Sequence, residues 1–330
     1  ILILRQPSLF LLVNLKIIIK IVAIIAIYIL ILTLLNGNIL SRQYKSIVIP
    51  IIVNIILAVS LNLVTGFLGE LSLGHAGFMS IGAYTGALIS VYSKLPPLPT
   101  IIIAMLAGST IAAVFGFIIG VPVLRLRGDY LAIVTLAFGE IIKSIINSIK
   151  FMGGAKGLTK IPLYTDYQNF WIAYICMIIT IIFLLNLVKS RTGRAITAIR
   201  DNDIAAESVG INISKYKVVA FVIGAFFAGL AGVIYAHNVG LIKPTTFDYN
   251  KSIEILVIVV LGGMGSISGS IIAAIILTLL PEFLRGADNL RMLMYAIVLI
   301  IMMIVNNSKI KQGIMTNKTL SKLFKGFKEV

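Results

Sequence analysis

The sequence predicts an all-α polytopic membrane protein, a closely packed bundle of about ten transmembrane helices with glycine-rich breaks. Of its 330 residues, 59% are hydrophobic and only 12% are charged, which is about half the charged fraction of a typical soluble domain. Isoleucine and leucine fill runs long enough to cross a bilayer as a helix, which takes roughly 20 apolar residues. These runs lack the alternation of apolar and polar residues that membrane barrel strands show.

Ten apolar segments account for most of the chain. They cover residues 17–35, 48–66, 74–93, 100–121, 130–149, 170–188, 217–236, 253–267, 269–284 and 290–306. The two segments flanking the glycines at 262–269 fit either two spans or one re-entrant unit. We therefore expect a cytoplasmic segment at 1–16, a transmembrane domain at 17–306 and a basic cytoplasmic tail at 307–330.

The net charge of +16 fits a membrane topology better than a nucleic-acid partner. Lys and Arg gather at the ends of the apolar segments, and no basic stretch is interleaved with aromatic residues. If the N-terminus is inside and ten spans alternate, the positive charges favour the cytoplasmic side, where both termini would lie. The tail from Lys309 to Lys328 is expected to contact anionic membrane lipids. Cys176 is the single cysteine, so no disulfide forms within the chain.

Small residues recur every four positions in three of the apolar segments, and such strips let helices approach closely. They are expected to serve packing and to say nothing about a substrate. The strips are Gly108, Ala112, Gly116 and Gly120; Gly224, Ala228, Gly232 and Ala236; and Gly262, Ser266, Ser270 and Ala274.

A polar stripe enters the segment at 48–66 and is followed by a glycine-rich break. Asn54 and Asn62 lie on one face of this segment, where polar side chains face protein or water rather than lipid. Three glycines then interrupt the helix between residues 66 and 74. Irregular backbone at membrane depth is tolerated where protein or a water-filled cavity satisfies it, so this stretch is a candidate to line a substrate path. The alternative is a cytoplasmic turn with solvated side chains. The polar residues concerned are Glu70, Ser72 and His75.

A second break, Leu261–Gly269, resembles the first in composition and contains Ser266. Thr135 and Ser266 complete the candidates for the substrate path. Glu140 and Glu254 lie within or at the ends of spans, where a carboxylate is more often paired than part of a proton relay. No cluster of His, Cys or Asp has metal-ligand spacing, and no catalytic set of side chains is apparent.

The polar stretch at 189–217, between two long apolar runs, predicts a docking surface for a partner in water. Asp201, Asn202 and Asp203 are expected to cap a short helix that Gly210 ends. Arg194 and Arg200 flank it and suit acidic partner residues or lipid phosphates. A solvated loop without a partner is the alternative. The residues expected to contact the partner are Arg194, Arg200, Asp201, Asn202, Ala205, Ala206, Glu207 and Gly210.

Several motifs together resemble the LivM-type permeases of branched-chain amino acid ABC importers, in order from about residue 50 to 306. The docking loop departs from the family's EAA pattern at its first position, where Ile204 replaces Glu. The motifs are Asn62–Phe78, Ile81–Thr85, Leu126–Glu140, Gly153–Leu158, Thr192–Ala206 and Leu261–Ser266.

The resemblance implies a non-catalytic permease in the cytoplasmic (inner) membrane of a bacterium or archaeon. Its implied partners are a second permease of the LivH type, two ATP-binding subunits and an extracytoplasmic substrate-binding protein that docks on the loops at 150–169 and 237–252. The chain itself has no phosphate loop of the G-x-x-x-x-G-K-[ST] type, so no cofactor is expected in it, and ATP with Mg would be bound by the partner ATPase. The implied mechanism is alternating access. A permease for urea, short amides or another small solute, a stand-alone carrier or channel, and a membrane enzyme are the alternatives.

Overall fold

The computed structural model describes residues 42–284 apart from 125 and 127, together with scattered positions between 22 and 35 and between 296 and 300. It divides into two compact units, Ile1–Val48 and Ile49–Val330. The second unit contains every described helix that begins after residue 62. The expected segments at 1–16 and 307–330 lie outside the described residues, as do most of the expected span at 290–306 and about half of the one at 17–35.

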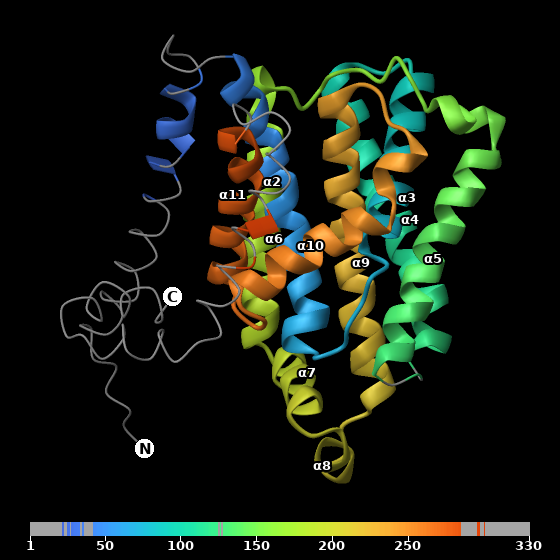
Figure 1. Ribbon diagram of the computed structural model, residues 1–330, viewed down its shortest axis with the longest axis vertical. Coiled ribbons are helices and arrows are strands. Elements are labelled where there is room, and N and C mark those ends of the chain that lie inside the picture. Colours follow the sequence, from blue (N-terminus) through green and yellow to red (C-terminus); the bar gives the residue numbers. More distant parts are fainter. Residues whose placement is uncertain are drawn as a thin grey trace, which may run out of the picture. The chain divides into compact units, whose positions relative to one another are not determined.

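Eight helices correspond to the expected apolar segments (Figure 1). Among the described residues, the stretches built on five of them are long and apolar enough to cross a membrane, and no strand forms. The all-α membrane fold is confirmed, and the count of ten spans is not. The eight are α2 (Arg42–Asn62), α3 (His75–Tyr92), α4 (Pro97–Val123), α5 (Asp129–Ser148), α6 (Phe170–Lys189), α9 (Ile213–Val239), α10 (Tyr249–Gly262) and α11 (Ile267–Phe283).

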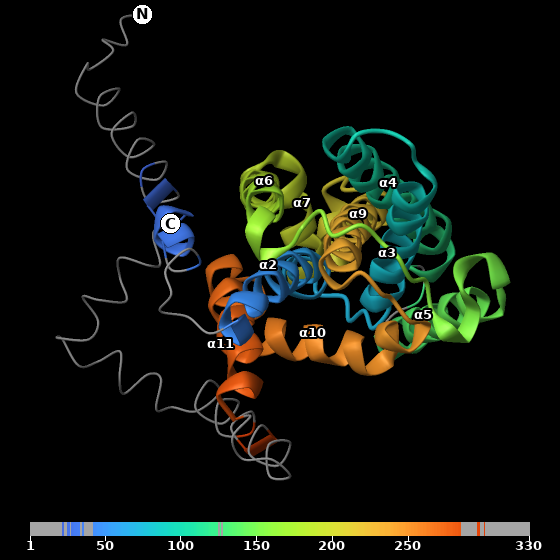
Figure 2. The same ribbon diagram turned by 90° about the horizontal axis from the view of Figure 1, so that it is seen from above.

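Helix α10 differs from the full-length span expected at 253–267. It has 14 residues, which at 1.5 Å per residue is about 21 Å, less than the roughly 30 Å of a bilayer's hydrocarbon core. The helix lies across the long helices rather than along them (Figure 2). Hydropathy along the sequence gives the length of an apolar run but not its direction, so the orientation of α10 was not predictable.

Side-chain oxygens cap five helix starts. The capping residues are Ser190, Asn202, Asn212, Asp248 and Ser266. Each accepts a hydrogen bond from a backbone N–H of the first helical turn, which has no partner inside the helix. The first two caps begin α7 (Arg191–Asp201) and α8 (Asp203–Ser208), which together form the polar stretch between α6 and α9.

Helices α3, α4 and α9 pack closely through small residues. Any side chain on Gly82 of α3 would overlap the backbone of Gly229 in α9, and one on Gly232 would overlap the carbonyl of Met79. A methyl group on Gly229 would approach the Ala112 side chain of α4 to 2.5 Å. The predicted role of small-residue strips in packing is confirmed for these helices.

The two loops expected to face outside lie at the same end of these helices, and α7 and α8 lie at the other (Figure 1). The backbone of Leu158 pairs with that of Ile242 through two hydrogen bonds, 2.9 and 3.1 Å long. Thr165 also donates a hydrogen bond to the Ile234 carbonyl, at 2.9 Å. The segments 150–169 and 237–252 therefore form one connected surface.

Candidate functional site

In the first helix break, the Gly66 carbonyl accepts its hydrogen bond from a distant side chain and not from the backbone N–H four residues on. Helix α2 passes into a π-helical turn, Leu63–Phe67, and the chain then continues without regular structure to residue 74. In a regular α-helix the Glu70 N–H would donate to the Gly66 carbonyl. Here it donates to the Val64 carbonyl at 3.1 Å instead. The Gly66 carbonyl must therefore be satisfied by another group.

Arg200, near the end of α7, supplies that group. Its Nη1 donates to the Gly66 carbonyl oxygen at 3.1 Å, while Nε and Nη2 donate to Asp201 Oδ1 at 3.1 and 2.9 Å. Gly69 adopts a left-handed φ of +82°, and a Cβ there would approach Arg200 Cγ to 2.7 Å. Glycine at 69 thus permits both the turn and the close contact. Arg200 was expected to face a partner or lipid; its side chain is 38% exposed and also reaches the Gly66 carbonyl inside the fold.

Asn62 connects the first break to the second. Its Nδ2 donates to the Ser266 carbonyl at 3.0 Å and to Ser270 Oγ at 2.8 Å, and its Oδ1 accepts from Gly265 N at 2.8 Å. The Asn62 side chain is completely buried. A Cβ on Gly265 would lie 3.3 Å from Arg200 Nη1. Helix α7 and both breaks therefore meet at one point, which we call the junction (Asn62, Gly66, Arg200, Gly265 and Ser266).

A buried ion pair between Glu70 and Lys217 forms a further link to the polar stretch. Glu70 lies in the first break, and Lys217 lies in the first turns of α9, just after α8. Their side chains are only 14% and 9% exposed. Removing one member of such a pair leaves an uncompensated buried charge.

Three hydrogen bonds hold the start of α3. His75 Nε2 lies 2.9 Å from Ser60 Oγ of α2, the Leu73 N–H donates to Thr135 Oγ1 of α5 at 3.0 Å, and the Ala76 N–H donates to Ser252 Oγ of α10 at 3.1 Å. His75 is 3% exposed, so the alternative of a solvated turn is wrong for this residue. The start of α3 is thus tied to three other helices.

The remaining path candidates also make structural contacts or are buried. Ser72 is buried, and Ser266 caps α11 by accepting from Gly269 N at 3.2 Å. Asn54 lies apart from the junction and donates to Thr278 Oγ1 at 2.9 Å. The structure brings Asn62 and Ser266 together and places Asn54 about two turns earlier on the same side of α2. There Lys251 Nζ of α10 donates to Asn54 Oδ1 at 3.3 Å.

The outward surface of α8 and the residue that follows it carries exposed apolar side chains beside the polar Glu207 and Ser208. Asn202 caps it through a 2.9 Å hydrogen bond from Ala205 N, and Gly210 follows it with a left-handed φ of +84°, as predicted. Ile204 and Val209 are 73% and 75% exposed. Ala206, expected on the docking face, is buried at 3% because it packs inward. Among the other expected contacts, Ala205, Glu207 and Gly210 are exposed.

The two carboxylates expected in spans are both paired. Glu140 accepts from Lys143 Nζ at 2.8 Å and from the Tyr249 N–H at 3.1 Å. Glu254 accepts from Lys251 Nζ at 3.1 Å. Arg194 of α7 donates to the Lys189 carbonyl at 3.0 Å. Within the part of the chain that the structure describes, no group of three His, Cys, Asp or Glu side chains is placed to hold a metal ion.

In the described part of the chain, membrane-spanning helices carry two breaks that meet beside Arg200 of the polar segment, which is the organisation of a membrane transport subunit. The chain belongs to the family described as branched-chain amino acid transport system / permease component, which matches residues 43–305. The chain is thus a permease of this family.

Individual relatives are also named as permease proteins. The chain is 37% identical over 296 residues to the high-affinity branched-chain amino acid transport system permease protein LivM of Escherichia coli, covering 80% of this chain and 69% of that protein. It is 26% identical over 242 residues to LivH of Salmonella typhimurium, covering 67% and 78%. It is also 26% identical over 279 residues to the ribose import permease protein RbsC of Haemophilus influenzae, covering 77% and 82%. No solved structure matches the chain.

Proposed function

We propose that this chain is one of two permease subunits of an ATP-driven importer of branched-chain amino acids in a cytoplasmic membrane, and that it works by alternating access. The 37% identity to LivM, against 26% to a ribose permease, supports amino acids over sugars as the cargo. The weaker similarity to LivH supports a related second permease as the partner.

The hydrogen bond from Arg200 to the Gly66 carbonyl is the observation that carries the mechanism. In the proposal, two ATP-binding subunits hold ATP and Mg and contact the exposed apolar residues of α8. When they close, α7 and α8 move together. Arg200 then passes that displacement to the first break, and through Gly265 and Asn62 to the second.

The consequence of moving Arg200 follows from the hydrogen bond that it donates to the Gly66 carbonyl. Withdrawal of Arg200 leaves the Gly66 carbonyl without its donor, and a buried unsatisfied carbonyl is costly. The first break is then expected to rearrange. Because α3 begins at residue 75, directly after this break, the rearrangement changes the position of α3 in the bundle. An extracytoplasmic binding protein would deliver the amino acid at the surface formed by 150–169 and 237–252.

The test is uptake of labelled leucine by the complete transporter in vesicles with ATP inside. Arg200→Ala removes a charge-assisted hydrogen bond, a type of contact worth about 1.5–3 kcal/mol. We therefore expect ATP-dependent uptake to fall by about tenfold or more, while the ATPase subunits remain bound and still hydrolyse ATP. Arg191→Ala is the matched control, since Arg191 lies on the same helix, is exposed and is not among the residues expected to contact the partner.

Three results would contradict parts of the proposal. Leucine uptake without the ATP-binding subunits would identify a stand-alone carrier. Uptake of ribose or urea with no uptake of leucine would reject the substrate. Equal uptake by the Arg200→Ala and Arg191→Ala variants would reject the coupling route through the junction.

A further inference from the structure

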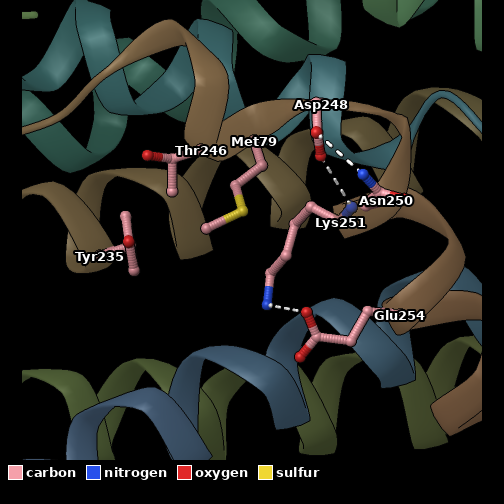
Figure 3. A pocket seen from close by; sticks show the side chains of 7 residues that line it. All are labelled: Met79, Tyr235, Thr246, Asp248, Asn250, Lys251 and Glu254. Carbon is pink, nitrogen blue, oxygen red and sulfur yellow. Dashed lines mark hydrogen bonds and ion pairs between the residues drawn. The ribbon is translucent and has the colours of Figure 1, made fainter. Parts of the chain in front are cut away.

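A small cavity lies away from the junction, between α3, α9, the 3-10 turn Pro244–Phe247 and the start of α10 (Figure 3). Its volume is about 320 Å³, at the lower end of the roughly 300–1,000 Å³ found for ligand pockets. A space of this size suits a molecule as small as a single amino acid.

One side of the cavity carries a charge pair of opposite signs. Lys251 and Glu254 are three residues apart on α10, so their side chains project from the same face. Lys251 Nζ donates to Glu254 Oε2 at 3.1 Å and to Asn54 Oδ1 at 3.3 Å. A Lys ammonium has three donors, so one remains after these two contacts. The side chains are 19% and 43% exposed, for Lys251 and Glu254 respectively.

The neighbouring carboxylate of Asp248 is already engaged. Its Oδ1 accepts from the Lys251 N–H at 3.3 Å and its Oδ2 accepts from Asn250 Nδ2 at 3.1 Å. Asp248 therefore fixes the start of α10 and orients the residues that follow. Lys251 and Glu254 are the charges that remain directed at the cavity.

The other side of the cavity is less polar. Met79 of α3 and Tyr235 of α9 line it, and Figure 3 shows them across the open space from the Lys251 and Glu254 head groups. Methionine adapts to apolar groups of different shape because it is unbranched and polarizable. The cavity thus presents a cation and an anion on one wall, with the Met79 thioether, the Tyr235 ring and the Thr246 hydroxyl on the other side.

We propose that this cavity binds the transported α-amino acid, with its carboxylate on Lys251, its ammonium group on Glu254 and its aliphatic side chain against Met79 and Tyr235. The inference rests on the proposed function, which supplies amino acids as the cargo. Insertion of a zwitterion between the two charges leaves each with an opposite partner. A lone anion or cation leaves one of the two charges without an opposite partner, and a neutral sugar supplies no charge for either.

Binding of labelled leucine to the complete transporter in lipid nanodiscs, without the binding protein, tests the site directly. The variant Lys251→Met/Glu254→Gln removes both charges together, which avoids leaving one unpaired. We expect its affinity for leucine to fall by about tenfold or more, the loss predicted for a charge-assisted contact. The control is Lys143→Met on α5, a residue that does not line the cavity and, unlike Glu140, does not contact the start of α10. The control is expected to bind leucine as the wild type does.

Two leucine analogues separate recognition from a structural effect. The first, 4-methylpentanoate, lacks the ammonium group, and the second, 3-methylbutylamine, lacks the carboxylate. Both are expected to compete poorly with leucine in the wild type. In Glu254→Gln, the preference for leucine over 4-methylpentanoate should disappear, whereas a purely structural role for Glu254 would leave that preference intact.

The outcomes are distinguishable. Absence of leucine binding to the wild type, or unchanged binding and preference in the variants, overturns the site. ATP-dependent leucine uptake that is unaltered by the double variant also overturns the site and leaves the proposed function standing. Leucine binding that depends on Lys251 and Glu254, in a transporter without ATP-dependent leucine uptake, contradicts the proposed function and supports the site.

Discussion

Removal of Lys217 is expected to destabilise the protein strongly through its buried partner. The substitution Lys217→Met leaves the Glu70 carboxylate, whose side chain is 14% exposed, without the cation that it contacts. Breaking a buried ion pair by removing one partner costs about 3–5 kcal/mol. At about 2 °C per kcal/mol for a chain of this size, the apparent Tm should fall by roughly 6–10 °C.

The double variant Glu70→Gln/Lys217→Met separates pairing from packing. Because it removes both charges, its apparent Tm should lie within about 1–2 kcal/mol, or roughly 2–4 °C, of the wild type. Lys143→Met is the control, since its ion pair with Glu140 is 26% and 36% exposed and such pairs contribute about 0–1 kcal/mol. The measurement is the fraction of intact transporter after heating, by size-exclusion chromatography. A Tm for Lys217→Met equal to that of Lys143→Met, or a double variant as unstable as the single one, would refute the reasoning.

Two further predictions concern packing and docking. Gly82→Ala places a methyl group against the Gly229 backbone and should reduce the yield of folded protein severalfold, whereas Gly139→Ala, whose added Cβ would meet only an ordinary contact at 3.9 Å, should be tolerated. Comparable yields for the two variants would contradict the close α3–α9 packing. Val209→Lys puts a charge on the exposed apolar surface of α8 and should reduce co-purification of the ATP-binding subunits, while Val239→Lys, the same exchange at the opposite end of α9, should not. Equal recovery of those subunits with both variants would argue against docking at α8.

The sequence predicts those features that depend on neighbouring residues. Apolar runs of about 20 residues must form helices in a membrane because the backbone has no other partners there. The cap at Asn202 and the glycine turn at Gly210 are local patterns, and the structure confirms both. The break between residues 66 and 74 was likewise predictable from its glycines, because glycine alone adopts the φ of +82° found at Gly69 without strain.

Contacts between distant parts of the chain were not predictable. Arg200 and Gly66 are 134 positions apart, and Lys217 and Glu70 are 147 apart. A single sequence contains no information on which polar groups in separate helices face each other. For the same reason the sequence indicated Asn54 as a path residue but missed Lys251, which contacts it, and Tyr235 across the cavity. The inward position of Ala206 also depends on tertiary packing.

The position of Arg200 explains why a polar segment at one end of the bundle can act on helices inside it. A side chain bonded to a regular helix would find its carbonyls already paired with backbone N–H groups four residues on. At Gly66 that backbone donor is displaced, since the Glu70 N–H bonds to Val64 instead. Arg200 therefore supplies a hydrogen bond on which the break itself depends. Asn62 serves the second break in the same way, by accepting from Gly265 N. Both breaks are stabilised by side chains from other segments, and in the proposed mechanism a movement of those segments shifts the balance between broken and regular helix.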